Sequence, residues 1–169
     1  REFAPLLLGL YQVLPGSQRR KLPEIDWVIV EEPEMGLHPK AIAVFMLLVL
    51  DLLWRGYQVV LSTHSPSVLD VVWALQRVAE SKGKWQHLAR AFGVSGPNIG
   101  NVLGNALKAK YRTFYLDFDA TTRTITSRDI SALDPWSEND AEASWGGLTG
   151  FSSNFGEAVR RAVNEGRSR

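Results

Sequence analysis

The sequence has 169 residues, 45% of them hydrophobic and 22% charged, with 14 glycines, 8 prolines and no cysteine. This composition is typical of a globular domain and excludes collagen, a long coiled coil and a disulfide scaffold. Nineteen basic and eighteen acidic residues leave a net charge of +1, which gives no argument for binding nucleic acid or an acidic membrane. The longest apolar runs fall short of the roughly 20 residues that span a bilayer, and a cysteine-free chain without a leader suits the cytosol. We therefore expect a cytoplasmic protein with no membrane partner.

The first residues carry an apolar pattern with helical spacing. Apolar side chains recur every three or four residues and stop at Pro15-Gly16, which predicts a helix with one apolar face. The residues of this face are Phe3, Leu6, Leu7, Leu10, Tyr11 and Leu14. Because the chain enters this pattern without an initiator Met, we interpret Arg1 as a cut edge.

A continuous apolar run over residues 27–30 predicts a strand that is buried on both faces. The run ends abruptly in the acidic sequence Glu31-Glu32-Pro33-Glu34. A helix is expected over residues 40–55, since Pro39 suits an N-terminal position and Gly56 suits the end. The acidic residues therefore lie at the carboxyl end of the strand.

A second buried strand is expected over residues 57–62, and it ends in Thr63-His64-Ser65-Pro66. Ser65 can cap a helix over residues 67–79. The inward positions of this helix are Val68, Leu69, Val72 and Leu75. The alternation of strand and helix predicts an α/β fold with a parallel sheet, in which ligands lie beyond the carboxyl ends of the strands.

The pattern weakens from Glu80 onward. Two short helices are expected over residues 85–92 and 99–109, followed by a strand over 111–118 with a hairpin partner over 121–130. Residues 133–150 are rich in turn formers, and a terminal helix follows with apolar positions at Phe155, Val159, Ala162 and Val163.

The polar residues at the two strand ends suit nucleotide hydrolysis. Of two adjacent carboxylates, one can hold hydrated Mg²⁺ and the next can orient or deprotonate the attacking water, a division that Glu31 and Glu32 allow. An imidazole at the next strand end, that of His64, can reach a terminal phosphate. The alternatives are that the acids begin a solvated turn and that the histidine is a structural hydrogen-bonding residue.

These residues resemble a known family. The block Trp-Val-Ile-Val-Glu-Glu-Pro-Glu-Met-Gly-Leu-His-Pro over residues 27–39, and Val-Val-Leu-Ser-Thr-His-Ser-Pro over 59–66, resemble the Walker B, D-loop and switch-histidine segments of ABC-type ATPases. More narrowly, they resemble the AAA-labelled ATPases of the OLD and SMC-like branch. Residues 1–10 are similar to the segment after that family's signature motif. The resemblance is closest over residues 26–69 and faint beyond Ala79.

The resemblance implies a P-loop NTPase-like carboxyl-terminal lobe over residues 1–79, with a helical and β-hairpin extension over 80–169. It implies ATP and Mg²⁺ as ligands, with Glu31 as the Mg²⁺-associated Walker B acid. Glu32 would be the general base and His64 the sensor of the γ-phosphate. The D-loop, which crosses a dimer interface in this family, would be Met35, Gly36, Leu37 and His38. Glu31 stands where the broader family has Asp, although this branch often has Glu.

One expected motif does not occur in the sequence. Gly-x4-Gly-Lys-[Ser/Thr], the loop that cradles phosphates, is absent, so the chain resembles the second half of a nucleotide site. The glycine-rich stretch over residues 93–100 has no Lys and contains Pro97, and we interpret it as a turn before a helix. The missing loop would come from an upstream segment or a partner chain.

Three further features leave alternatives open. Asp117 and Asp119 either chelate a metal, as in the Toprim-type nuclease domains of OLD proteins, or belong to a hairpin turn. Trp136 and Trp145 either anchor a partner or pack on the sheet edge. The basic tail either contacts DNA phosphates or forms a solvated helix face, and it contains Arg160, Arg161, Arg167 and Arg169.

The leading hypothesis is an ATPase that couples nucleotide-driven homodimerisation to an effector, in DNA repair or anti-phage defence as the resemblance implies. The first alternative is a non-catalytic module that completes the nucleotide site of a partner. The second is a metal-dependent nuclease that uses Asp117 and Asp119 with the glutamate pair.

Overall fold

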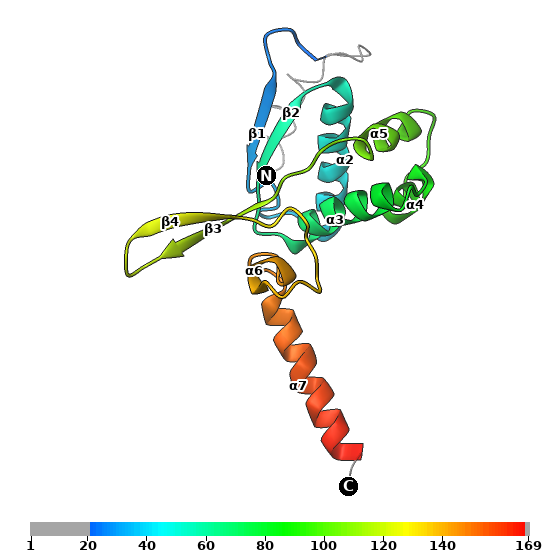
Figure 1. The fold of residues 1–169 in the computed structure, drawn as a ribbon. Helices are drawn as coiled ribbons and strands as arrows, with labels where there is room; N and C mark the ends of the chain where they lie inside the picture. The colour runs from blue at the N-terminus through cyan, green and yellow to red at the C-terminus, as the bar shows by residue number, and fades with distance from the viewer. Residues whose placement is uncertain (1–20, 168–169) are drawn as a thin grey trace. The chain divides into compact units, whose positions relative to one another are not determined.

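The computed structural model describes residues 21–167, and the chain divides into two compact units, Arg1–Lys110 and Tyr111–Arg169 (Figure 1). The helix predicted over residues 3–14 lies outside the described residues. Among the described residues, every helix is too short or too polar to cross a membrane.

The first unit is built on a strand, a helix and a strand, as predicted. Strands β1 (Trp27–Glu31) and β2 (Gln58–Ser62) pair in parallel, with Glu31 opposite Ser62. Helix α2 (Pro39–Arg55) connects them, and Gly56 ends it in the left-handed region, with φ of 99°. The N–H of Gly56 donates to the carbonyls of Leu52 and Leu53, which satisfies the last turn of the helix.

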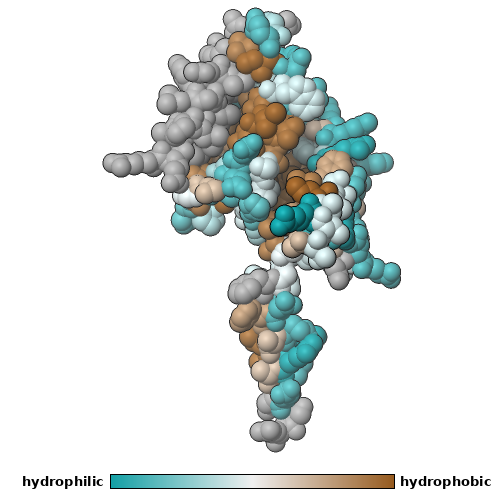
Figure 2. Space-filling view, turned by 90° about the vertical axis from the view of Figure 1, so that its left-hand side faces the viewer, coloured by the Kyte–Doolittle hydropathy of each residue, from teal (hydrophilic) through white to brown (hydrophobic). Residues whose placement is uncertain are grey.

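Among the described residues, helices cover one face of the two strands. Their inward residues, Val28, Val30, Val59 and Leu61, pack against the buried side chains Ile42, Phe45, Met46 and Val49 of α2. On the opposite face Trp27, Ile29 and Val60 are exposed, with 69% of Ile29 accessible. Figure 1 shows α2 on a single side of the strands, and Figure 2 shows apolar surface in this unit. The prediction that the first strand is buried on both faces is not met within the described residues, where Trp27 and Ile29 are exposed.

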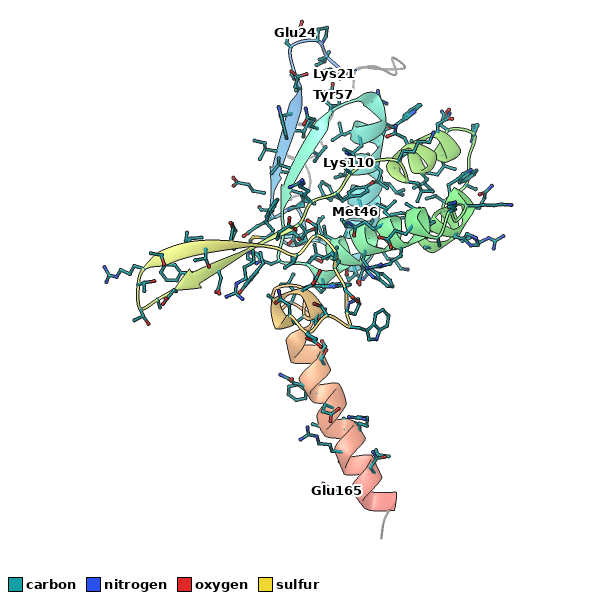
Figure 3. All side chains as sticks on the ribbon, viewed as in Figure 1. Lys21, Glu24, Met46, Tyr57, Lys110 and Glu165 are labelled. Carbon is teal, nitrogen blue, oxygen red and sulfur yellow. The ribbon has the colours of Figure 1, made fainter. Side chains whose placement is uncertain are left out.

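Three more helices follow in the described part of the first unit. They are α3 (Pro66–Glu80), α4 (Trp85–Phe92) and α5 (Ile99–Ala106), and α2 contacts both α3 and α5. Met46 of α2, labelled in Figure 3, shares a buried cluster with Val68 of α3. The predicted inward positions Val68, Leu69 and Leu75 are confirmed, whereas Val72 is only partly buried. Helix α5 ends three residues earlier than predicted.

A buried tyrosine fixes the loop before β1. The hydroxyl of Tyr57 accepts a hydrogen bond from the N–H of Leu22 at 2.8 Å, and its ring packs with Leu52. Figure 3 shows Tyr57 beside Lys21, whose ammonium group pairs with Asp26. These contacts hold the entry to β1 against the start of β2.

The second unit contains a hairpin and two helices. Strands β3 (Phe114–Asp119) and β4 (Thr124–Asp129) pair antiparallel, followed by α6 (Asp140–Ala143) and α7 (Gly150–Arg167). Phe114, Leu116, Phe118 and Ile125 are exposed apolar residues of the hairpin, and Phe155, Val159 and Val163 are exposed on α7. Figure 2 shows the apolar and polar sides of α7. The predicted hairpin and terminal helix are confirmed, and the stretch rich in turn formers contains the short helix α6.

Candidate functional site

The carboxyl ends of β1 and β2 lie side by side because the strands are parallel neighbours. The N–H of Glu32 donates to the carbonyl oxygen of Ser62 at 3.0 Å and lies 3.3 Å from the Ser62 hydroxyl. The residue after β1 is thereby joined to the last residue of β2. Both polar clusters noted in the sequence meet at this edge of the sheet.

Glu32 has an unusual backbone conformation. Its φ is 43°, which lies in the left-handed region that residues with a Cβ rarely adopt. Such a conformation costs on the order of 1–3 kcal/mol and persists where the surroundings impose it. Here the two contacts with Ser62 supply that constraint, and they turn the chain sharply out of β1.

The side chains of Glu32 and His64 meet at the same edge. Nε2 of His64 lies 2.9 Å from Oε1 of Glu32, and the two side chains are 78% and 40% exposed. An exposed imidazole beside an exposed carboxylate can exchange protons and hydrogen bonds with a ligand. The structure thus brings together the predicted base and the predicted phosphate sensor, whose roles stay predictions.

A third acid, Glu34, belongs to this site and received no role from the sequence. Its Oε1 accepts hydrogen bonds from the Thr63 hydroxyl at 2.7 Å and from the N–H of His64. The Thr63 oxygen in turn accepts from the N–H of Ser65 at 3.0 Å. The other carboxylate oxygen of Glu34 is buried without a hydrogen-bond partner among the described residues. The signal available in the sequence was a third acid at one strand end and a hydroxyl residue directly before the histidine at the other.

The predicted D-loop residues form the turn that leads into α2. Met35 and Gly36 are exposed, and Gly36 has a φ of 72°. Leu37 packs against the core cluster below the sheet, and Nδ1 of His38 caps α2 by accepting from the N–H of Lys40 at 3.2 Å. Leu37 and His38 therefore have structural contacts within the unit, while Met35 and Gly36 face outward.

Glu31 is exposed at the end of β1, next to Glu32. Carboxylate oxygens are the ligands that Mg²⁺ prefers, and Mg²⁺ commonly uses one or two protein carboxylates together with substrate phosphates and water. Within residues 21–167 no group of three or more acidic, histidine or cysteine side chains is arranged to hold a metal. The described residues therefore form no closed metal site, and an ion at Glu31 would need most of its ligands from phosphate and water.

The aspartates of the hairpin have structural contacts in the second unit. Asp117 lies 3.5 Å from Arg128 across the hairpin. Asp119 accepts from the N–H of Thr121 at 2.8 Å, and hydrogen bonds from Thr122 and Thr121 hold the pKa of Asp119 below its usual value. These contacts favour the hairpin-turn interpretation over a nuclease metal site.

Two arginines of the basic tail have local contacts, and the two tryptophans differ in exposure. Arg160 and Arg161 both pair with Glu157 on α7, and these two partners lower the pKa of Glu157. Trp136 is 82% exposed, so it does not pack on the sheet edge, whereas Trp145 is buried. Arg169 lies outside the described residues.

A protein-family model described as "AAA domain, putative AbiEii toxin, Type IV TA system" matches residues 1–70. No curated protein and no solved structure matches the chain. The mixed α/β structure is compatible with a P-loop NTPase-like AAA domain, a family that generally binds ATP with Mg²⁺. The match therefore supports an AAA-type ATPase domain in the part of the chain that contains Glu32 and His64.

Proposed function

We propose that this chain supplies the hydrolytic side of an ATPase site of the OLD-like branch, where water cleaves the β–γ phosphoanhydride of ATP. Glu32 orients the water and accepts its proton, and His64 donates a hydrogen bond to the γ-phosphate. The observation that carries the proposal is the 2.9 Å approach of His64 Nε2 to Glu32 Oε1. This contact puts a candidate base, Glu32, beside a candidate hydrogen-bond donor, His64. Both lie at the carboxyl ends of the strands, where parallel α/β sheets bind ligands.

Glu31 is the residue that would hold Mg²⁺. The ion, when bound with ATP, neutralises charge on the phosphates. Because Glu31 and Glu32 are consecutive at the exit from a strand and Glu32 turns sharply, their carboxylates can serve different atoms of one substrate.

The proposal also requires residues that bind the phosphates of ATP from outside this sequence. The sequence has no Gly-x4-Gly-Lys motif, so the lysine would come from another segment of the polypeptide or from a partner chain. The exposed residues Met35 and Gly36 would then face the other subunit of a homodimer, and closure around ATP would drive an effector in DNA repair or anti-phage defence. The same missing motif favours a second candidate function, a non-catalytic module that completes the ATPase site of a partner.

The test is Glu32→Gln in the full-length protein. The amide keeps the size of the side chain but cannot accept the proton, so we expect turnover to fall by about 10²-fold or more while ATP binding is retained. Glu24→Gln, which changes an exposed carboxylate before β1, is the matched control with turnover unchanged. Unchanged turnover in Glu32→Gln would remove Glu32 from its role, and ATP binding without hydrolysis in the wild type would favour the non-catalytic module.

A further inference from the structure

We infer that Glu34 is a positioning residue that sets the place of His64 relative to Glu32. This inference rests on the proposed ATPase function, and it adds a role that neither the sequence motif nor the family match assigns. Glu34 reaches from the turn after β1 to the loop after β2, a separation of 30 residues along the chain.

The imidazole of His64 has few contacts to hold it. The side chain is 78% exposed, and its contact at the strand ends is with Oε1 of Glu32. Packing therefore does not fix the ring, and its position depends on where the backbone of the loop is held. A histidine that reports on a phosphate needs a defined position, because hydrogen-bond energy falls steeply with distance and angle.

Glu34 supplies that backbone anchor through one oxygen. Oε1 accepts from the N–H of His64 itself and from the hydroxyl of the preceding Thr63 at 2.7 Å. Because the Thr63 oxygen also accepts from the N–H of Ser65, the anchor extends to the residue before α3. The three loop residues are thus held by one carboxylate and one hydroxyl.

The same anchor links the sensor to the base. Glu34 follows Glu32 by two residues, and the N–H of Met35 donates to the carbonyl of Glu32 at 3.1 Å, so the turn that carries both acids is closed. Glu32 contacts the His64 ring and Glu34 contacts the His64 backbone. Glu34 therefore anchors the backbone that carries the sensor, while Glu32 contacts the sensor's ring.

The experiment compares Glu34→Ala, Glu34→Gln and the control Glu24→Ala in the full-length protein. Glu34→Ala removes the acceptor, and we expect kcat for ATP to fall about tenfold or more while KM changes by less than about threefold. Glu34→Gln keeps a carbonyl oxygen that can accept both hydrogen bonds, so we expect kcat within about threefold of wild type. A residue that only stabilised the fold would not separate kcat from KM in this way.

Amide hydrogen exchange at His64 provides a readout that does not need hydrolysis. We expect protection of the His64 N–H to be lost in Glu34→Ala and kept in Glu34→Gln and Glu24→Ala. If Glu34→Ala fails to fold by circular dichroism, Thr63→Val replaces it. This variant removes one of the two donors to Glu34 and also the acceptor of the Ser65 N–H, and we expect a severalfold fall in kcat with His64 protection kept.

The possible failures are distinguishable. Absence of ATP hydrolysis in the wild type refutes the proposed function, and the exchange measurement then still tests the anchor. An active wild type with undiminished kcat in a folded Glu34→Ala, or in Thr63→Val where that replaces it, overturns the positioning role alone. Equal loss of kcat in Glu34→Gln and Glu34→Ala also overturns it, because the acceptor oxygen would then be irrelevant.

Discussion

The left-handed backbone of Glu32 predicts an inverted preference between glycine and alanine at this position. Glu32→Gly and Glu32→Ala both remove the side chain, so they lose the contact with His64 equally. They differ in the backbone, because at a φ of 43° the Cβ of alanine destabilises the folded state by about 1–2 kcal/mol, whereas glycine has no Cβ. At ordinary positions glycine is instead less stable than alanine by about 0.4–1 kcal/mol, through the entropy of the unfolded chain.

Glu24 is the matched control, since it is exposed and does not have a positive φ. The unfolded-state terms cancel when the glycine and alanine variants are compared at both positions. At each position we compare the free energy of unfolding of the glycine variant with that of the alanine variant. We expect this comparison to favour glycine at Glu32 by about 1–2 kcal/mol more than it does at Glu24. Urea denaturation followed by circular dichroism measures these four variants.

Turnover is measured in the same variants. Both Glu32 variants lack the carboxylate, so both should lose ATP hydrolysis although their stabilities differ. If the glycine and alanine variants differ in unfolding free energy by the same amount at both positions, the reasoning is refuted. The left-handed backbone at Glu32 would then have no energetic cost for a residue with a Cβ.

Two further predictions concern stability. Leu75→Ala removes a fully buried side chain from α3. We expect urea denaturation to show that the free energy of unfolding falls by about 2–5 kcal/mol. A fall of less than about 1 kcal/mol would contradict the packing of this helix. Asp119→Asn should destabilise the hairpin at pH 7, because hydrogen bonds from Thr122 and Thr121 favour the ionised carboxyl and hold its folded pKa below its usual 3.8. That stabilisation is present above the unfolded pKa and is lost as the pH falls through the folded pKa. The difference in stability between wild type and Asp119→Asn should therefore vanish in strong acid. A stability difference that does not change with pH in thermal melts would refute this prediction.

The described strands and helices of the first unit were predictable because their signals are local. The apolar run at residues 27–30, the Pro39 start and the Gly56 stop each act within a few residues, and the structure has β1 and α2 at these positions. Burial was less predictable, because an apolar run shows the character of a strand but not how many of its faces are covered. Ile29 is apolar and exposed for this reason.

The positions of the candidate site residues were predictable, whereas their contacts were not. The sequence put two acids and a histidine at the ends of two strands, and the structure adds the contact between Glu32 and His64. The role of Glu34 depends on the register of β1 against β2, which sets it opposite Thr63 and His64 across 29 and 30 residues. No local sequence pattern encodes that register. The left-handed backbone of Glu32 also could not be predicted from a local sequence pattern.

The contacts between the strand ends have a consequence for how the site forms. The bonds from Glu32 to Ser62 and from Glu34 to His64 each close a loop of 30 residues, most of which is the single helix α2. Closing a flexible loop of about 30 residues costs about 3 kcal/mol in chain entropy, and the pairing of parallel strands is slow. The contacts that join the two strand ends therefore form together with the pairing of β1 and β2. All of these residues precede the hairpin and α7 in the chain, so the segments that make this edge are complete before the second unit is synthesised.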